Sequence, residues 1–161
     1  MPPASIPHLA QAAVQQLTAR GLTLATAESC TGGMIAAALT EAAGASRVFR
    51  YGWVTYARES KERDLGVPAE LIERHTVVSE PVVQAMAESA LEQAHADYAL
   101  AVSGNAGPTA PPGEPPVGTV CIALATPGGT YTTTLVRPHL SRHDFRAMVV
   151  REALELLLRQ F

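Results

Sequence analysis

The chain has 161 residues, of which 47% are hydrophobic and 5% aromatic, so it is long enough for one domain with a buried core. Its formal net charge of -3 at pH 7 provides no basic excess for binding phosphate backbones, which argues against a nucleic acid partner. The sequence has neither a signal-peptide pattern nor an apolar run long enough to span a bilayer. We therefore expect a single domain over residues 1–161, located in the cytoplasm and without a membrane partner.

The first half of the chain alternates helical and extended patterns. Apolar residues at helical spacing predict an amphipathic helix over 6–20, which Gly21 is placed to end. The elements expected after it are a buried strand over 22–27, a helix over about 32–43, a strand over 48–57 and a solvated helix over the charged run 58–64.

The second half contains one long loop and a hairpin. Ser79 is a natural N-cap for a helix that continues toward His95. The elements expected after it are a buried strand over 98–102, a Gly- and Pro-rich loop, two strands over 117–126 and 130–136, and a helix over about 141–159. The turn Pro127-Gly128-Gly129 joins the last two strands as a hairpin and makes the sheet mixed.

This alternation predicts an α/β fold, a three-layer α/β/α sandwich with a mixed central sheet. Ligands of such sheets bind near the carboxyl ends of strands. Three segments fall at such ends: Ser29, the stretch 56–61 and the loop 103–107. We expect them to converge on one crevice.

The segment 25–34 predicts a strand-loop-helix corner that contains a nucleophile. The unpaired N–H groups and positive dipole end of the following helix stabilise an anion or a developing oxyanion there. Ser29 is one candidate, and a helix cap is its alternative explanation. Cys30 is the other, because a thiol at a helix N-terminus can have a lowered pKa, but burial is the commoner fate of such a cysteine. The pair Gly32-Gly33 allows a ligand to approach the backbone or forms a tight turn.

Ser29 needs a base, and no histidine follows it at a spacing that suggests a local pair. Lys61 is the best candidate base, provided that burial or a nearby positive charge lowers its pKa. A solvated lysine in a charged run is the alternative. The loop 103–108 has the composition of an anion cradle, but it lacks the Lys and Ser/Thr of a Walker loop.

We expect no metal and no cofactor. Cys30 and Cys121 are the only cysteines, and we treat both as free thiols because their spacing matches no metal motif. His139 and His143 lie near Asp144, but the helix start falls between the two imidazoles and no third ligand stands out. Solvated histidines are the simpler interpretation.

Five motifs in this order resemble the CinA C-terminal domain family. They are AESCTGG at 27–33, VTYxxxxK at 54–61, VSEPVVxxMA at 78–87, SGxAGP at 103–108 and PVGTV at 116–120. The resemblance covers nearly the whole chain. It implies a stand-alone domain without the N-terminal domain of longer family members, and a homodimer.

The resemblance also implies an activity, the deamidation of nicotinamide mononucleotide to nicotinate mononucleotide and ammonia without a metal. By this analogy Ser29 attacks the carboxamide carbon, Lys61 is the base and Tyr56 relays or orients the proton. Backbone N–H groups of Cys30 and Thr31 would hold the oxyanion. The implied substrate-binding residues are Gly32, Gly33, Ser103, Asn105, Ala106, Gly107, Arg142 and Arg146, and one of the two arginines would face the phosphate or be solvated.

The chain departs from the family pattern before the final helix, where Leu140-Ser141-Arg142 keeps only the arginine of the usual GlyAspArg, and at two further places near the expected site. Arg58 stands where the family often has asparagine, and it would either lower the pKa of Lys61 or obstruct the pocket. The loop 109–116 is rich in proline and lacks the usual lysine. These departures support an alternative function, a catalytically silent nucleotide-binding or competence-associated interaction module of the same fold.

Overall fold

The computed structural model describes residues 3–161 and contains a mixed five-stranded sheet, which confirms the predicted fold class. The strand order is β2-β1-β3-β4-β5. β1 pairs in parallel with both β2 and β3, whereas β3, β4 and β5 pair in antiparallel fashion. The strands are β1 (Leu24–Glu28), β2 (Phe49–Val54), β3 (Tyr98–Gly104), β4 (Thr119–Thr126) and β5 (Gly129–Val136).

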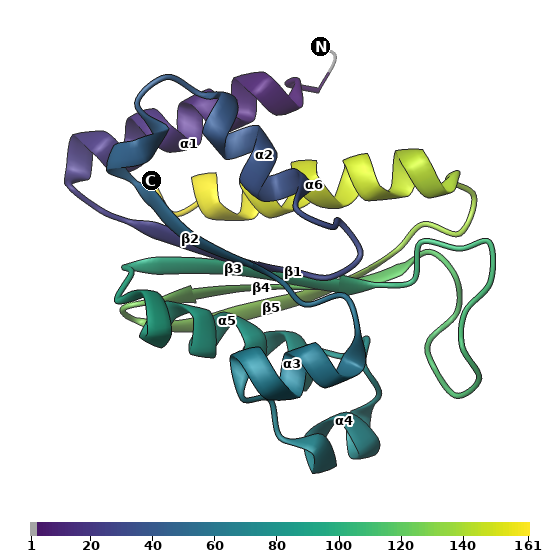
Figure 1. Cartoon of the computed structure of the whole chain (residues 1–161). Coiled ribbons are helices and arrows are strands. Elements are labelled where there is room, and N and C mark those ends of the chain that lie inside the picture. Colours follow the sequence, from purple (N-terminus) through teal and green to yellow (C-terminus); the bar gives the residue numbers. More distant parts are fainter. Residues whose placement is uncertain (1–2) are drawn as a thin grey trace.

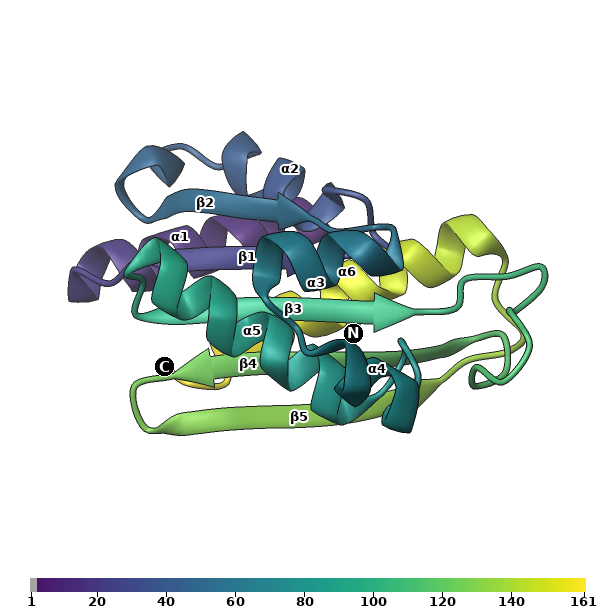
Figure 2. The ribbon, with the colours of Figure 1, turned by 60° about the horizontal axis from the view of Figure 1, so that its bottom comes forward.

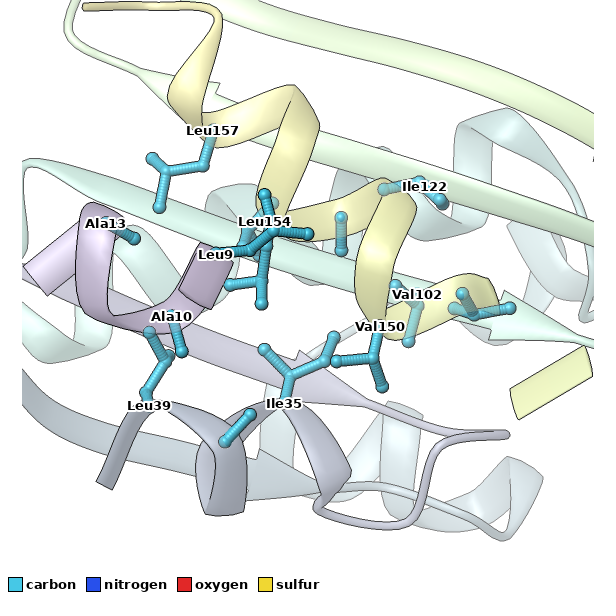
Figure 3. Packing of buried hydrophobic residues seen from close by; sticks show 14 of the residues in the cluster. Leu9, Ala10, Ala13, Ile35, Leu39, Val102, Ile122, Val150, Leu154 and Leu157 are labelled. Atoms are coloured by element: carbon cyan, nitrogen blue, oxygen red, sulfur yellow. The ribbon is translucent and has the colours of Figure 1, made fainter. Parts of the chain in front are cut away.

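Three helices cover one face of the sheet, and they are α1 (Ile6–Arg20), α2 (Met34–Glu41) and α6 (Arg142–Leu158) (Figure 1). Their apolar side chains pack against the residues of β3 and β4 that face these helices, in the larger of two core clusters. Leu9, Ile35 and Leu154 come from the three different helices and point toward one another in this cluster (Figure 3). A short 3-10 turn, η1 (Ala45–Arg47), leads into β2.

The other face is covered by α3 (Arg58–Leu65), α4 (Ala69–His75) and α5 (Glu80–Ala94) (Figure 2). Small residues of β1, β3 and β4 allow α5 to pack closely against the sheet in a second core cluster. Helix α4 was not expected from the sequence. Gly66 ends α3 with a left-handed residue, and Pro68 then serves as the N-cap of α4, so the same two residues that interrupt one helix begin the next. No helix of residues 3–161 is long and apolar enough to cross a membrane.

The predicted elements are confirmed, with shifts at their ends. β1 continues to Glu28, one residue beyond the expected end, because Glu28 still pairs with Val54 of β2. β2 ends at Val54, before the expected position 57. β3 extends to Gly104, two residues further than expected, because its last residues still pair with β4.

The connections on either side of β1 create the crevice for a site. The chain leaves β1 through α2 on one face to reach β2, and it reaches β3 through α3, α4 and α5 on the other face. The loops that follow β1 and β3 therefore diverge, which is the topological switch point where open α/β sheets bind ligands. The loop after β3 projects from this edge (Figure 1).

The core on the α1-α2-α6 side should dominate stability. Leu154 is fully buried there, so Leu154→Ala removes apolar contacts and leaves a cavity. We expect a loss of about 2–5 kcal/mol in the free energy of unfolding, measured by chemical denaturation. The control Val136→Ala lies at a position that is 49% exposed and should cost less than about 1 kcal/mol. Equal losses in the two variants would contradict this description of the core.

Candidate active site

The corner after β1 is held by the carboxylate of Glu28, which is 1% exposed. It accepts hydrogen bonds from the Thr31 hydroxyl at 2.5 Å and from the backbone N–H groups of Ile35 and Ala36 at 2.9 and 3.0 Å. The carboxylate thus provides acceptors for N–H groups in the first turn of α2, and it lies at the positive end of the helix dipole. The alternative that Ser29 is the helix cap is wrong, because Ser29 caps nothing here.

Glu28 was missed by sequence reasoning. The available signal was an acidic residue shortly before the helix start, a place where carboxylates are favoured. It was overlooked because the hydroxyl and thiol of the next two residues are the more obvious reactive groups.

Lys61 lies beneath Ser29 and is completely buried, so the alternative of a solvated lysine is wrong. Its Nζ is 2.8 Å from Ser29 Oγ, 2.5 Å from the Thr55 carbonyl oxygen and 3.5 Å from the Tyr56 carbonyl oxygen. The two backbone carbonyls orient the amine, and its third hydrogen-bond partner is the Ser29 hydroxyl. A neutral amine in this position is within reach of the Ser29 proton.

Burial lowers the pKa of Lys61 from 10.5 to about 8, and the nearby Cys30 and Glu114 act weakly in the opposite direction. Lys61 forms no ion pair with any residue of 3–161. Arg58 pairs with Glu62 and Glu73 instead, at 3.4 and 3.6 Å, and is not a cause of the lowered pKa. With a pKa near 8, about one lysine in ten is neutral at pH 7.

The thiol of Cys30 is a poor competitor for the nucleophile's role. Cys30 is 5% exposed, and burial raises the pKa of its thiol from 9.0 to about 12, so the thiolate is scarce near neutral pH. This agrees with the interpretation of Cys30 as a small buried side chain. Cys121 is buried as well, and both cysteines are free.

The backbone around Cys30 is oriented by an arginine from α6. Arg146 donates from Nε to the Cys30 carbonyl at 2.9 Å and from Nη2 to the Thr31 carbonyl at 3.1 Å. The N–H groups of Cys30 and Thr31 donate to no other residue of 3–161. Cys30 lines the cavity beside Ser29, whereas Thr31 is fully buried and lies outside the cavity wall.

The two glycines of the corner are explained by backbone conformation. Gly32 and Gly33 have φ of +59° and +103°, a region that side chains disfavour. A Cβ at Gly32 would also lie 3.2 Å from Arg146 Nη2. Neither glycine lines the cavity beside Ser29, so the close turn accounts for the pair without a ligand.

A cavity of about 460 Å³ opens beside Ser29. Of the residues proposed from the sequence, the structure brings eight to its wall: Ser29, Cys30, Tyr56, Ser103, Asn105, Ala106, Gly107 and Arg142. The others lie outside the wall: Thr31, Gly32, Gly33, Lys61 and Arg146. Lys61 is still in direct contact with the cavity residue Ser29.

Tyr56 and Arg142 form one rim of the cavity. Arg142 donates from Nη1 to the Gly107 carbonyl at 2.6 Å and from Nη2 to the Tyr56 hydroxyl at 3.0 Å. The Tyr56 side chain is 60% exposed, and its hydroxyl makes no hydrogen bond to Ser29 or Lys61. Tyr56 contacts the amine through its backbone carbonyl only.

The cavity wall contains a second residue that sequence reasoning missed. Glu114 accepts hydrogen bonds from the N–H groups of Val77 at 2.8 Å and Val78 at 3.0 Å, and all three residues line the cavity. Asn105 Nδ2 donates to the Pro115 carbonyl at 2.7 Å. The proline-rich loop is thereby held at its second arm, at residues 114 and 115. Its glutamate carried no motif, so only the fold reveals its position.

The part of the chain that the structure describes contains no cluster of metal-binding side chains. Residues 3–161 contain no group of three or more His, Cys, Asp or Glu side chains placed to hold an ion. The polar groups of the cavity wall are hydroxyls, amides, guanidinium groups and one carboxylate.

The fold and the site define an α/β protein with a buried serine–lysine pair at a topological switch point. The model of the CinA C-terminal domain matches residues 7–161, and the chain belongs to this family. The resemblance inferred from the five motifs is thus confirmed.

Relatives fall into two length classes. A CinA-like protein of Akkermansia muciniphila is 51% identical over 93% of this chain, which spans only 36% of that relative. The chain covers about a third of the length of such curated relatives. By contrast, the Escherichia coli K12 protein named nicotinamide-nucleotide amidohydrolase PncC is 45% identical over 96% of this chain and 93% of its own length.

Solved structures support the same assignment. The crystal structure of a competence-damaged protein (CinA) superfamily protein from Escherichia coli has a TM-score of 0.94 to this chain at 37% identity. It covers 98% of this chain and 91% of its own.

Removal of the Glu28 carboxylate should weaken the corner. Glu28→Ala leaves the Thr31 hydroxyl and two buried N–H groups without an acceptor, and we expect a loss of about 1–3 kcal/mol in the free energy of unfolding. Glu28→Gln retains one acceptor oxygen and should lose less. The control Glu41→Gln, at an exposed position of α2, should change the midpoint of urea unfolding little. A Glu28→Ala variant as stable as this control would show that the carboxylate does not hold the corner.

Proposed function

We propose that this chain is a nicotinamide-nucleotide amidohydrolase, which converts nicotinamide mononucleotide to nicotinate mononucleotide and ammonia. The observation that carries the proposal is the buried Lys61 amine, 2.8 Å from Ser29 Oγ and free of any carboxylate partner among residues 3–161. The family and the name of the Escherichia coli relative, which matches this chain over 93% of its own length, supply the reaction. The substrate is accordingly a small molecule.

In the proposed acylation step Ser29 Oγ attacks the carboxamide carbon while its proton passes to neutral Lys61 Nζ. The carbonyl oxygen becomes an oxyanion, and the free N–H groups of Cys30 and Thr31 are the proposed donors to it. When the carbon–nitrogen bond breaks, the nitrogen takes a proton from Lys61 and leaves as ammonia. The product of this half-reaction is an ester of Ser29.

In the second half-reaction a water attacks this ester and gives its proton to Lys61. The carbon–oxygen bond to Ser29 then breaks, Oγ recovers a proton from Lys61, and nicotinate mononucleotide leaves. Each half-reaction takes up and returns one proton at the same amine. The lowered pKa of Lys61 suits this role, because both forms are accessible near neutral pH.

The remaining residues of the cavity have proposed roles in binding. Of the two candidate arginines, Arg142 is the one on the cavity wall, and we assign the phosphate to it. Arg146 donates to the carbonyls of the oxyanion corner and is assigned a positioning role. Tyr56 is assigned to orient Arg142, since the hydroxyl contact supports this better than a proton relay.

The proposal includes features that come from sequence and family alone. These are a single domain over residues 1–161, a homodimer, a cytoplasmic location, and activity without nucleic acid or cofactor. The arginine at position 58, which motivated a catalytically silent alternative, is paired with Glu62 and Glu73 rather than with Lys61. Arg58 nevertheless lines the cavity, so the silent alternative is kept as an outcome of the test below.

Ammonia release from nicotinamide mononucleotide tests the reaction and the pair together. We expect activity in the purified protein and a loss of at least about a thousandfold in Ser29→Ala and Lys61→Met, because nucleophile and base act as a unit. The matched control Cys30→Ala should keep activity within about tenfold, since the thiol is not the nucleophile.

The control for this experiment is circular dichroism, which checks that each variant is folded. Absence of ammonia from the wild-type protein, together with intact nucleotide binding, would favour the silent module over the amidohydrolase. Loss of activity in Cys30→Ala with retention in Ser29→Ala would reassign the nucleophile.

The pH profile tests the state of the base. Only the neutral amine accepts the Ser29 proton, and burial places the pKa of Lys61 at about 8. The value of kcat/KM should therefore rise about tenfold for each pH unit up to about pH 8 and level off above it. The measurement is the initial rate of nicotinate mononucleotide formation between pH 6 and 9. A profile that is flat across this range would exclude Lys61 as the base.

A further inference from the structure

Glu114 is the one carboxylate on the wall of the cavity, and the proposed reaction does not use it. It is half-buried, and each oxygen accepts one backbone hydrogen bond, Oε2 from Val77 and Oε1 from Val78. These two bonds fix the carboxylate in place. Because a carboxylate has about four acceptor sites, its charge is oriented by the bonds but not neutralised by them.

The carboxylate belongs to the reacting end of the cavity. Val77, one of its two partners, accepts a hydrogen bond from Ser103 Oγ at 3.1 Å, and Ser103 stands near the end of β3, the strand next to β1 and Ser29. Glu114 is also close enough to Lys61 to oppose the lowering of its pKa. Among residues 3–161, no lysine or arginine forms an ion pair with Glu114.

The cavity wall therefore carries charges of both signs. Glu114 is its one carboxylate, and its cations are Arg58 and Arg142, the latter at the rim formed with Tyr56 and Gly107. Nicotinamide mononucleotide is itself dipolar. Its ring nitrogen carries the ribose and a full positive charge, and its phosphate is an anion.

We propose that Glu114 determines specificity by recognising the positive charge of a pyridinium ring, so that the site selects N-substituted pyridinium carboxamides over carboxamides on a neutral ring. A quaternary nitrogen has no hydrogen to donate, so a fixed charge is the group that distinguishes it from a neutral ring of the same shape. The inference rests on the proposed function, because that function supplies the ligand.

The test compares two ligands that differ in ring charge. Nicotinamide mononucleotide has a cationic ring, whereas reduced nicotinamide mononucleotide has a neutral dihydropyridine ring with the same carboxamide, ribose and phosphate. Dissociation constants are measured in the Ser29→Ala background, where no turnover occurs. Glu114→Gln should weaken binding of the cationic ligand by about tenfold and change binding of the neutral ligand by less than about twofold.

Two further variants separate charge from loop structure. Glu114→Asp keeps the charge and should retain most of the preference for the cationic ring, even though its shorter side chain reaches Val77 and Val78 less well. Glu41→Gln removes one charge at an exposed position of α2 and should leave both affinities unchanged.

If Glu114→Gln weakened the binding of both ligands equally, Glu114 would only anchor the loop, and the inference would be overturned. The inference would also be overturned if the binding of neither ligand changed. These results are distinguishable from failure of the proposed function. Wild-type ammonia release with an unchanged ligand preference in Glu114→Gln would refute the inference alone. Absence of ammonia release would refute the function, whatever the preference.

Discussion

The structure depends on a lysine amine that is buried without a counter-charge. Removing an ammonium group from water is costly unless it is paired, so a buried lysine responds by losing its proton more easily. Lys61 has two backbone carbonyls and one hydroxyl as neighbours, and none of them is ionised. Burial of this amine thus lowers the free energy of unfolding, and it leaves the amine partly neutral near neutral pH. Buried amines with a lowered pKa are concentrated at functional sites.

The scaffold makes that arrangement possible at the end of β1. The backbone turns sharply there, and Glu28 and Arg146 hold the turn from opposite sides, one through N–H groups and the other through carbonyls. Both charged groups thus act on the backbone and not on a ligand. The result is a serine at the cavity wall whose hydroxyl is in contact with a buried amine. Such preorganisation is the main means by which acyl-transfer sites stabilise an oxyanion.

Sequence patterns predicted the layers, the mixed sheet and the convergence of three segments, because hydrophobic periodicity and glycine or proline breaks are local signals. They could not decide whether Lys61 was solvated, since it belongs to a run of charged residues in which burial depends on the packing of α3 against α5. Glu28 and Glu114 were missed for a similar reason. Each acts through backbone N–H groups that only the folded chain brings within reach, seven residues away for Glu28 and 36 or more for Glu114.

The departures from the family pattern also have a structural explanation. Arg58 contacts acidic residues of α3 and α4, and the proline-rich loop is anchored through Glu114 rather than through a lysine. Neither feature occupies the position of the base. The central claim is that Lys61 is a partly neutral amine in contact with Ser29, and the most direct measurement is an NMR titration of its side chain in protein labelled with ¹³C-lysine. The account predicts a pKa near 8 for the signal that is absent in Lys61→Met. A Lys61 signal that titrates near 10.5, as a solvated lysine does, would contradict it.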